Sequence, residues 1–168
     1  LDVDFYVLST YKVYGPHLAV MFGKYDLLKK MDGINHYFIT KDEVPYKFQP
    51  GNFNFELTYS LSGITEYLKE IHDYHFPELK SESNLIKYKT SFNLIAVQEQ
   101  HLADRLLGYL NLKKDIRIIG HKDSDMVKRV PTISFVHSRF RSSEIVSKVD
   151  KYKIGIRYGD FYAKKLIH

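Results

Sequence analysis

The longest regular pattern in this sequence is a series of apolar side chains at helical spacing between Leu85 and Leu110. Polar residues separate its members, which are Tyr88, Phe92, Ile95, Leu102, Leu106 and Leu110. The pattern predicts one amphipathic helix with a core-facing stripe, roughly 40 Å long at 1.5 Å per residue. Because that length exceeds the diameter of a small domain, we expect the helix to connect two lobes, residues 1–84 and 85–168.

Two short apolar runs near the start predict strands at residues 4–8 and 18–22. Both runs are apolar at successive positions, which is typical of strands buried on both faces of a helix-covered sheet. A short helix is expected from Asp26 to Met31, where Asp32-Gly33 ends it.

Residues 34–54 contain two prolines, a glycine and several asparagines, and no period persists through them. They are predicted to form a long ordered loop, and loops of such length inside compact domains are usually functional. Helical spacing resumes near Glu56 and ends before Pro77. The apolar stripe of this helix is Leu57, Leu61, Ile64, Leu68 and Ile71.

The second lobe has the pattern strand, strand, helix, strand, which predicts a small α+β domain with a three-stranded sheet. The strands are expected at residues 116–120, 132–137 and 155–158. Between the last two lies a predicted helix over residues 142–151, with Ser142 or Ser143 as its N-cap and Glu144 in its first turn. The fold class is therefore α/β with an α+β second lobe.

The chain has no cysteine, which excludes disulfides, thiolate metal sites and a cysteine nucleophile. This composition fits a reducing compartment, and a cytoplasmic location is expected. No stretch approaches the roughly 18 to 20 apolar residues of a membrane helix, and the first residues lack a signal-peptide pattern. We expect no membrane partner.

The formal net charge of +5 raises the alternative of a nucleic-acid-binding domain. Acidic residues interrupt the lysines nearly everywhere, so a solvated, mildly basic surface is favoured and no nucleic-acid partner is expected. His72 and His75 lie three apart on a predicted helix and could bind a metal. Surface histidines are the commoner explanation of such a pair, so no metal site is predicted.

Lys12 stands in the turn between the two N-terminal strands, directly before Val13-Tyr14-Gly15-Pro16. A lone lysine in a turn is ordinarily a solvent-facing residue. An amine attacks a carbonyl carbon only in its unprotonated form, which burial between two strands would favour. Ser9 and Tyr11 add hydroxyls suited to holding a phosphate, and Gly15 allows close backbone approach.

The segment S-T-Y-K-V-Y-G-P, residues 9–16, resembles the Ser-x-His-Lys-x-x-Gly-Pro segment of the class V aminotransferases. This family includes cysteine desulfurases and kynureninase, which are fold-type I pyridoxal-phosphate enzymes. The resemblance implies that Lys12 is the catalytic residue and forms a Schiff base with pyridoxal 5'-phosphate. It also implies that Ser9 and Tyr11 contact the cofactor phosphate, with Tyr11 in place of the commoner histidine.

Three further segments resemble the family in the same order. Residues 45–68 resemble R-x-E-x-G-T-P-N followed by a helix, in which the threonine reaches the cofactor phosphate of the partner subunit. Gly51 is kept there, and Asn52 takes the threonine position, so Asn52 is a predicted cofactor-binding residue. Residues 129–135 resemble R-x-P-x-x-S-F of the small domain, and residues 154–166 resemble V-R-x-G-x-x-C-A-x-P-L of cysteine desulfurases.

Tyr162 stands where desulfurases have their cysteine, so a persulfide cannot form on this chain. The sequence is most similar to a desulfurase-like subgroup that lacks the cysteine. Arg157 in the same segment is a predicted substrate-binding residue. An ion pair between Arg157 and Asp160 near a strand end is an equally weighted alternative.

The resemblance assigns residues 1–84 to the C-terminal part of a cofactor-binding large domain and residues 85–168 to a C-terminal small domain. It implies the C-terminal portion of a longer enzyme that acts on an amino-acid substrate as a homodimer. Transamination, racemisation, beta-elimination and hydrolytic cleavage all remain open. The alternative is an inactive remnant that serves as a dimerisation or interaction module.

Overall fold

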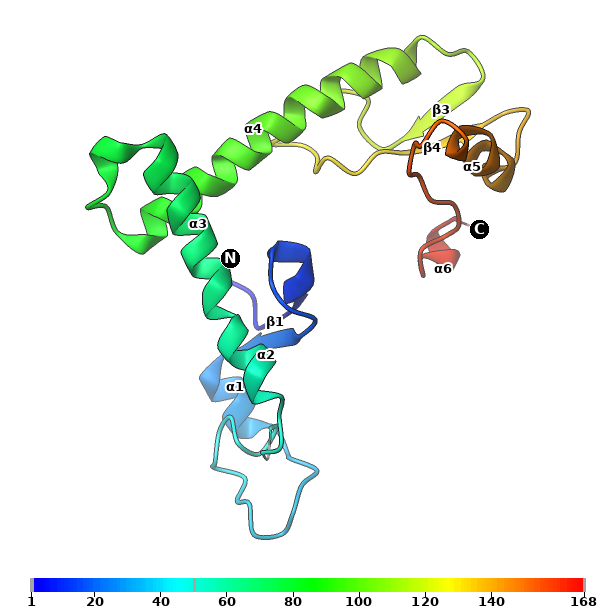
Figure 1. The fold of residues 1–168 in the computed structure, drawn as a ribbon. Coiled ribbons are helices and arrows are strands. Elements are labelled where there is room, and N and C mark those ends of the chain that lie inside the picture. The colour runs from blue at the N-terminus through cyan, green and yellow to red at the C-terminus, as the bar shows by residue number, and fades with distance from the viewer. Residues whose placement is uncertain (1, 50, 168) are drawn as a thin grey trace. The chain divides into compact units, whose positions relative to one another are not determined.

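A computed structural model describes residues 2–49 and 51–167 (Figure 1). The chain divides into two compact units, residues 1–91 and 92–168. The helix α4 (Asn84–Asn111) confirms the long helix predicted from the apolar stripe, and it contributes residues to both units. No helix in the described ranges combines the length and the apolar content that crossing a membrane would need.

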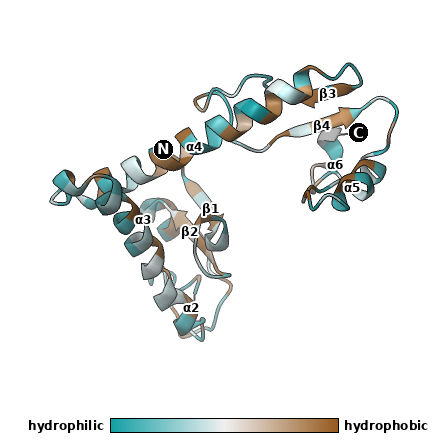
Figure 2. Cartoon of the chain, turned by 45° about the horizontal axis from the view of Figure 1, so that its top comes forward, coloured by the Kyte–Doolittle hydropathy of each residue, from teal (hydrophilic) through white to brown (hydrophobic). Residues whose placement is uncertain are grey.

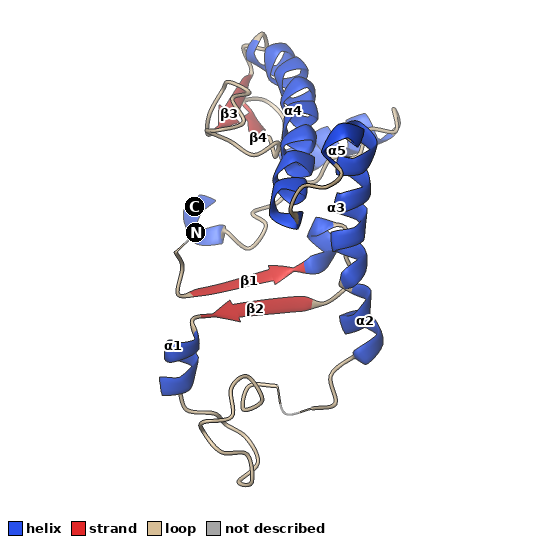
Figure 3. Cartoon of the chain, turned by 90° about the vertical axis from the view of Figure 1, so that its left-hand side faces the viewer, coloured by secondary structure: helices blue, strands red, loops and turns tan. Residues whose placement is uncertain are grey.

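An antiparallel hairpin of β1 (Phe5–Ser9) and β2 (Ala19–Gly23) opens the first unit, with Phe5 opposite Gly23 and Ser9 opposite Ala19 (Figure 3). Both strands were predicted within one residue. Their predicted burial on both faces is wrong, because β1 and β2 form a two-stranded sheet and most of their side chains are exposed. The 3-10 helix η1 (Thr10–Val13) follows β1 directly.

The rest of the first unit includes α1 (Tyr25–Lys30), loop residues 31–49 and 51–54, α2 (Phe55–Ser60) and α3 (Ser62–His75). The single helix predicted near Glu56 is thus divided at Leu61. The side chains of Thr58, Ser60 and Ser62 donate to backbone carbonyls three or four residues earlier. Such bonds compete with the helix ladder and bend helices, which accounts for the division.

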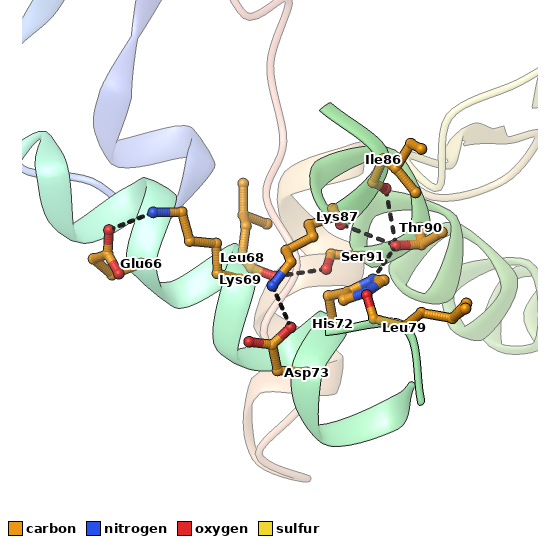
Figure 4. A network of polar contacts seen from close by, with 10 residues as sticks. All are labelled: Glu66, Leu68, Lys69, His72, Asp73, Leu79, Ile86, Lys87, Thr90 and Ser91. Atoms are coloured by element: carbon orange, nitrogen blue, oxygen red, sulfur yellow. Dashed lines mark hydrogen bonds and ion pairs between the residues drawn. The ribbon is translucent and has the colours of Figure 1, made fainter. Parts of the chain in front are cut away.

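The short 3-10 helix η2 (Pro77–Leu79) leads from α3 to α4, and a buried polar network joins these two helices (Figure 4). Ser91 donates to the Leu68 carbonyl at 2.7 Å. The His72 ring is fully buried, with Nδ1 2.6 Å from the Thr90 hydroxyl and Nε2 3.2 Å from the Leu79 carbonyl. His72 is therefore a core histidine and not the surface residue that the sequence suggested.

The second unit packs α4 against a hairpin of β3 (Ile116–Ile119) and β4 (Ser134–His137), in which Ile116 lies opposite His137. Figure 2 shows the apolar colouring of these strands. The core consists of Ala103, Leu107, Leu110 and Ile118. Leu102 and Leu106, which we predicted to be core, are 54% and 47% exposed. The side chains that α4 buries there are those of the next residues in the sequence, Ala103 and Leu107.

The predicted third strand is wrong, since residues 155–158 form no strand and the sheet has two strands. Left-handed backbone occurs on both sides of the segment, at Lys153, Phe161 and Tyr162, which confines extended geometry to the residues between them. The helices α5 (Ser142–Asp150) and α6 (Lys164–Ile167) complete the unit. Arg141, not Ser142 or Ser143, is the N-cap of α5, and its N–H donates to the Glu144 carboxylate in the predicted first turn.

An ion pair between Lys87 and Asp73, 2.7 Å apart, yields a pH-dependent prediction. The hydrogen bond from Lys87 holds the pKa of the Asp73 carboxyl below its usual value. A lowered folded-state pKa stabilises the fold above the unfolded pKa of about 4, and this stabilisation is lost as pH falls through the folded pKa. We expect Lys87→Met to raise the pKa of Asp73, and to destabilise the protein more at neutral pH than near pH 3.

Carbon NMR titration of the Asp73 carboxyl and urea unfolding at the two pH values measure both effects. Lys89→Met, a change on the same helix outside the pair, is the control. An equal loss of stability at both pH values would show that the pair does not set the pH dependence.

Candidate functional site

The turn between β1 and β2 is closed by the side chain of Thr10, which is 2% exposed. Its hydroxyl oxygen lies 2.7 Å from the Pro16 carbonyl and 2.8 Å from the Leu18 carbonyl. The backbone adds bonds from Thr10 N–H to Leu18 and from Gly15 N–H to the Thr10 carbonyl, at 2.8 and 2.9 Å. Hydrogen bonds of Thr10 thus join the two ends of the segment that carries Lys12.

Helix α3 supports the turn from behind. A Cβ atom on Gly15 would lie 2.6 Å from Ile64 Cδ1 and 2.9 Å from the Thr10 carbonyl oxygen, so only glycine fits at this close approach. Tyr14 has φ of 67°, the left-handed conformation that reverses the chain at the end of η1. The turn is consequently fixed on one side by Thr10 and on the other by α3.

Lys12 lies on η1 with an exposed side chain, and its Nζ is 5.7 Å from the centre of the Tyr11 ring. The expected burial between two strands is not found, because the hairpin leaves both of its faces open. In residues 2–49 and 51–167, no hydrogen bond or ion pair occupies the Lys12 ammonium. The amine is therefore accessible to a carbonyl compound, and its chemical role remains a prediction.

The turn brings three predicted site residues together: Ser9, half-buried at the end of β1, and Tyr11 and Lys12 on η1. It also adds His17. The rings of His17 and Tyr11 stack with their centres 4.9 Å apart and their planes 17° apart. Both rings are exposed.

Two predicted site residues lie elsewhere. Asn52 is exposed, has φ of 52° and precedes Asn54, the N-cap of α2. Over the described part of the chain, no hydrogen bond joins Asn52 to the turn. Arg157 belongs to the other unit, where its guanidinium lies 5.6 Å from the centre of the Phe161 ring.

The alternative ion pair between Arg157 and Asp160 is absent from the described residues. The Asp160 carboxylate instead accepts from the Tyr162 N–H at 3.3 Å. The same ranges contain no group of three or more His, Asp or Glu side chains that could hold a metal ion. The contacts of Arg157 therefore assign it no role.

A groove of about 570 Å³ lies behind the turn, lined by Tyr14, Gly15, Pro16, Ser60, Gly63 and Tyr67. The rings of Tyr14 and Tyr67 contact each other with their centres 5.1 Å apart. The groove is mainly apolar and no cation lines it, so it does not suit a phosphate.

The side chains of Ser9, Tyr11 and Lys12 carry groups whose chemistry suits a phosphorylated aldehyde. Hydroxyls on Ser9 and Tyr11 can donate to phosphate oxygens, and the Lys12 amine can condense with an aldehyde. Thr10 was missed by sequence reasoning, although a threonine between two candidate hydroxyl residues is a signal that could have identified it. Its buried hydroxyl is already occupied by two carbonyls, so it supports the site without being available to a ligand.

Comparison with known proteins matches residues 1–167 to the family "Aminotransferase class-V". The chain is 31% identical to the aminotransferase-like protein FGM3 of Gibberella zeae over 99% of this chain and 38% of that protein. It is 30% identical to the cysteine desulfurase-like protein ustD of Aspergillus flavus, over 89% of this chain and 30% of the relative. A cysteine desulfurase of Shigella flexneri is 25% identical over 99% of this chain and 38% of its own length.

The chain therefore spans less than two fifths of the length of these relatives.

The Thr10 bonds predict a matched pair of variants. Thr10→Val keeps the shape but removes the single O–H donor that the Pro16 and Leu18 carbonyls share. Both carbonyls keep a backbone N–H donor, so we expect a loss of about 0.5 to 1.5 kcal/mol in the free energy of unfolding. Thr10→Ser keeps the hydroxyl and is expected to lose less. Chemical denaturation of the two variants measures the difference, and a valine variant as stable as the serine variant would refute the role of the hydroxyl.

Proposed function

Because this chain belongs to the class-V aminotransferase family, we propose that it is part of a pyridoxal-phosphate-dependent enzyme that acts on an amino-acid substrate, with Lys12 as the cofactor-binding lysine. The family is one of pyridoxal-phosphate-dependent enzymes. The observation that supports the proposal most is the exposed Lys12 amine on a turn that Thr10 closes and that also carries Ser9 and Tyr11.

Each residue of the proposed site has a distinct task. Bound pyridoxal phosphate supplies an electron sink for charge at the substrate alpha carbon. Lys12 would hold the cofactor through its amine, and the same amine would move a proton at the substrate alpha carbon. Ser9 and Tyr11 would donate hydrogen bonds to the cofactor phosphate.

Two further roles belong to the intact protein. We propose that the Asn52 amide donates to the phosphate bound by the partner subunit of a homodimer. We also propose that the Arg157 guanidinium pairs with the substrate carboxylate, for which its planar fork is suited. Both side chains are exposed and free of ion pairs in the part of the chain described here, so both are available for these contacts.

We propose a reaction that does not use a persulfide formed on this chain. The chain has no cysteine, and Tyr162, 105% exposed, stands where the resemblance places the desulfurase cysteine. A phenol cannot accept sulfur as a persulfide, so the proposed reactions are transamination, racemisation, beta-elimination or hydrolytic cleavage. Product analysis with amino-acid substrates distinguishes these four outcomes.

A second candidate function is an inactive interaction module. It is favoured by the exposed apolar side chains of the hairpin, among them Val7 at 64% and Phe22 at 54%. A contact surface would cover such side chains, since burying them is favourable. This candidate predicts self-association without any covalent attachment of cofactor.

The central prediction concerns covalent attachment at Lys12. When the intact protein is incubated with pyridoxal phosphate and reduced with borohydride, we expect the peptide that contains Lys12 to gain the mass of the reduced cofactor. Lys12→Arg keeps the positive charge but cannot form the bond, and should abolish the added mass at this position. Lys24→Ala, a change directly after β2, should not.

Peptide mass mapping is the measurement, because it does not depend on turnover. Labelling of a different lysine, or equal labelling of the Lys12→Arg protein, would contradict the assignment. Absence of labelling together with a self-associated protein would instead support the interaction module.

A further inference from the structure

Lys47 in the loop before α2 is a buried lysine that the proposed chemistry does not use, with 2% of its surface exposed. Lys87, the other buried lysine of the described ranges, pairs with Asp73. Lys47 has no carboxylate partner in those ranges. Burying a charge is costly unless hydrogen bonds compensate it, so the atoms around Lys47 must provide the compensation.

Three backbone carbonyls surround the Lys47 ammonium. Its Nζ lies 3.1 Å from the Lys29 oxygen, 2.6 Å from the Met31 oxygen and 2.7 Å from the Lys41 oxygen. An ammonium group carries three N–H donors and no acceptor, so three acceptors match its protonated form one to one. The Phe48 ring, with its centre 5.2 Å from Nζ, adds a favourable face for a cation.

Two of the three carbonyls come from the end of α1. Lys29 lies in its last turn and Met31 is its C-cap. Carbonyls at the end of a helix lack partners within the helix and carry the negative end of its dipole, which favours a cation there. The third carbonyl, from Lys41, belongs to the loop, so the ammonium links the helix end to the loop.

The backbone of Lys47 also makes hydrogen bonds within the loop. Its N–H donates to the Glu43 carbonyl at 2.8 Å, and its carbonyl accepts from the Asn35 amide at 2.9 Å. A Cβ atom on Gly33 would lie 3.2 Å from Lys47 Cβ, so the start of the loop passes close to this residue. Residues 33–49 are thus arranged around one side chain.

We propose that the three carbonyls form a binding site for a primary ammonium, which Lys47 fills from within the chain and which must be filled for residues 33–49 to be ordered. Carbonyl oxygens can replace the hydration shell of a monovalent cation in the same way. This inference goes beyond the proposed function and does not depend on it. It also has a chemical consequence: a shortened residue 47 leaves a site that accepts a free alkylammonium.

Hydrogen exchange followed by mass spectrometry of the full chain tests the proposal on the peptide that covers residues 33–49. In Lys47→Ala we expect the exchange of this peptide to accelerate by about ten- to a hundredfold, because three carbonyls lose their donor. Propylammonium chloride replaces the atoms that alanine lacks and should restore slow exchange. Equal concentrations of sodium chloride or 1-propanol should not.

Two further variants isolate the charge. Lys47→Met fills nearly the same space without N–H donors, and should exchange fast with or without propylammonium. Lys41→Ala changes an exposed side chain of the same loop but keeps its carbonyl, and should exchange as the wild type does.

Slow exchange in Lys47→Met, or recovery of Lys47→Ala by sodium chloride or 1-propanol as well as by propylammonium, would overturn the proposal. The peptide that covers α4 serves as an internal reference for global unfolding. If Lys47→Ala unfolds without additive, refolding by propylammonium alone supports the site, and failure to refold overturns it.

Discussion

The candidate site depends on one hydroxyl group that itself meets no ligand. The Thr10 hydroxyl lies within hydrogen-bonding distance of two carbonyls on the far side of the turn, so the segment between β1 and β2 closes on itself. This closure fixes the direction in which η1 presents Lys12. Gly15 adds the second constraint, because Ile64 of α3 occupies the space that any larger side chain would need.

Much of the fold could be predicted from the sequence because helices and strands leave local periodic signals. The apolar stripe of α4 and the runs of β1 and β2 were of this kind, and their bounds were correct within one residue. The failures have causes that apolar periodicity does not record. The division at Leu61 arises from serine and threonine side chains that bond to the backbone, and residues 155–158 pair with no other strand of the described residues.

The candidate site was predictable only in part, for the same reason. The turn that carries Ser9, Tyr11 and Lys12 is contiguous, so sequence and family resemblance suffice to identify it. Tertiary contacts decide the rest: the stacking of His17 on Tyr11, and the burial of His72, which converted an apparent surface histidine into a link between α3 and α4. The expected burial of Lys12 failed because two strands alone cannot cover a side chain.

A crystal structure of the intact protein grown with pyridoxal phosphate tests the account most directly. The account predicts continuous electron density from Lys12 Nζ to the cofactor, with the hydroxyl oxygens of Ser9 and Tyr11 about 2.5 to 3 Å from phosphate oxygens. A cofactor joined to another lysine, or a phosphate bound away from this turn while Lys12 remains in solvent, would contradict it.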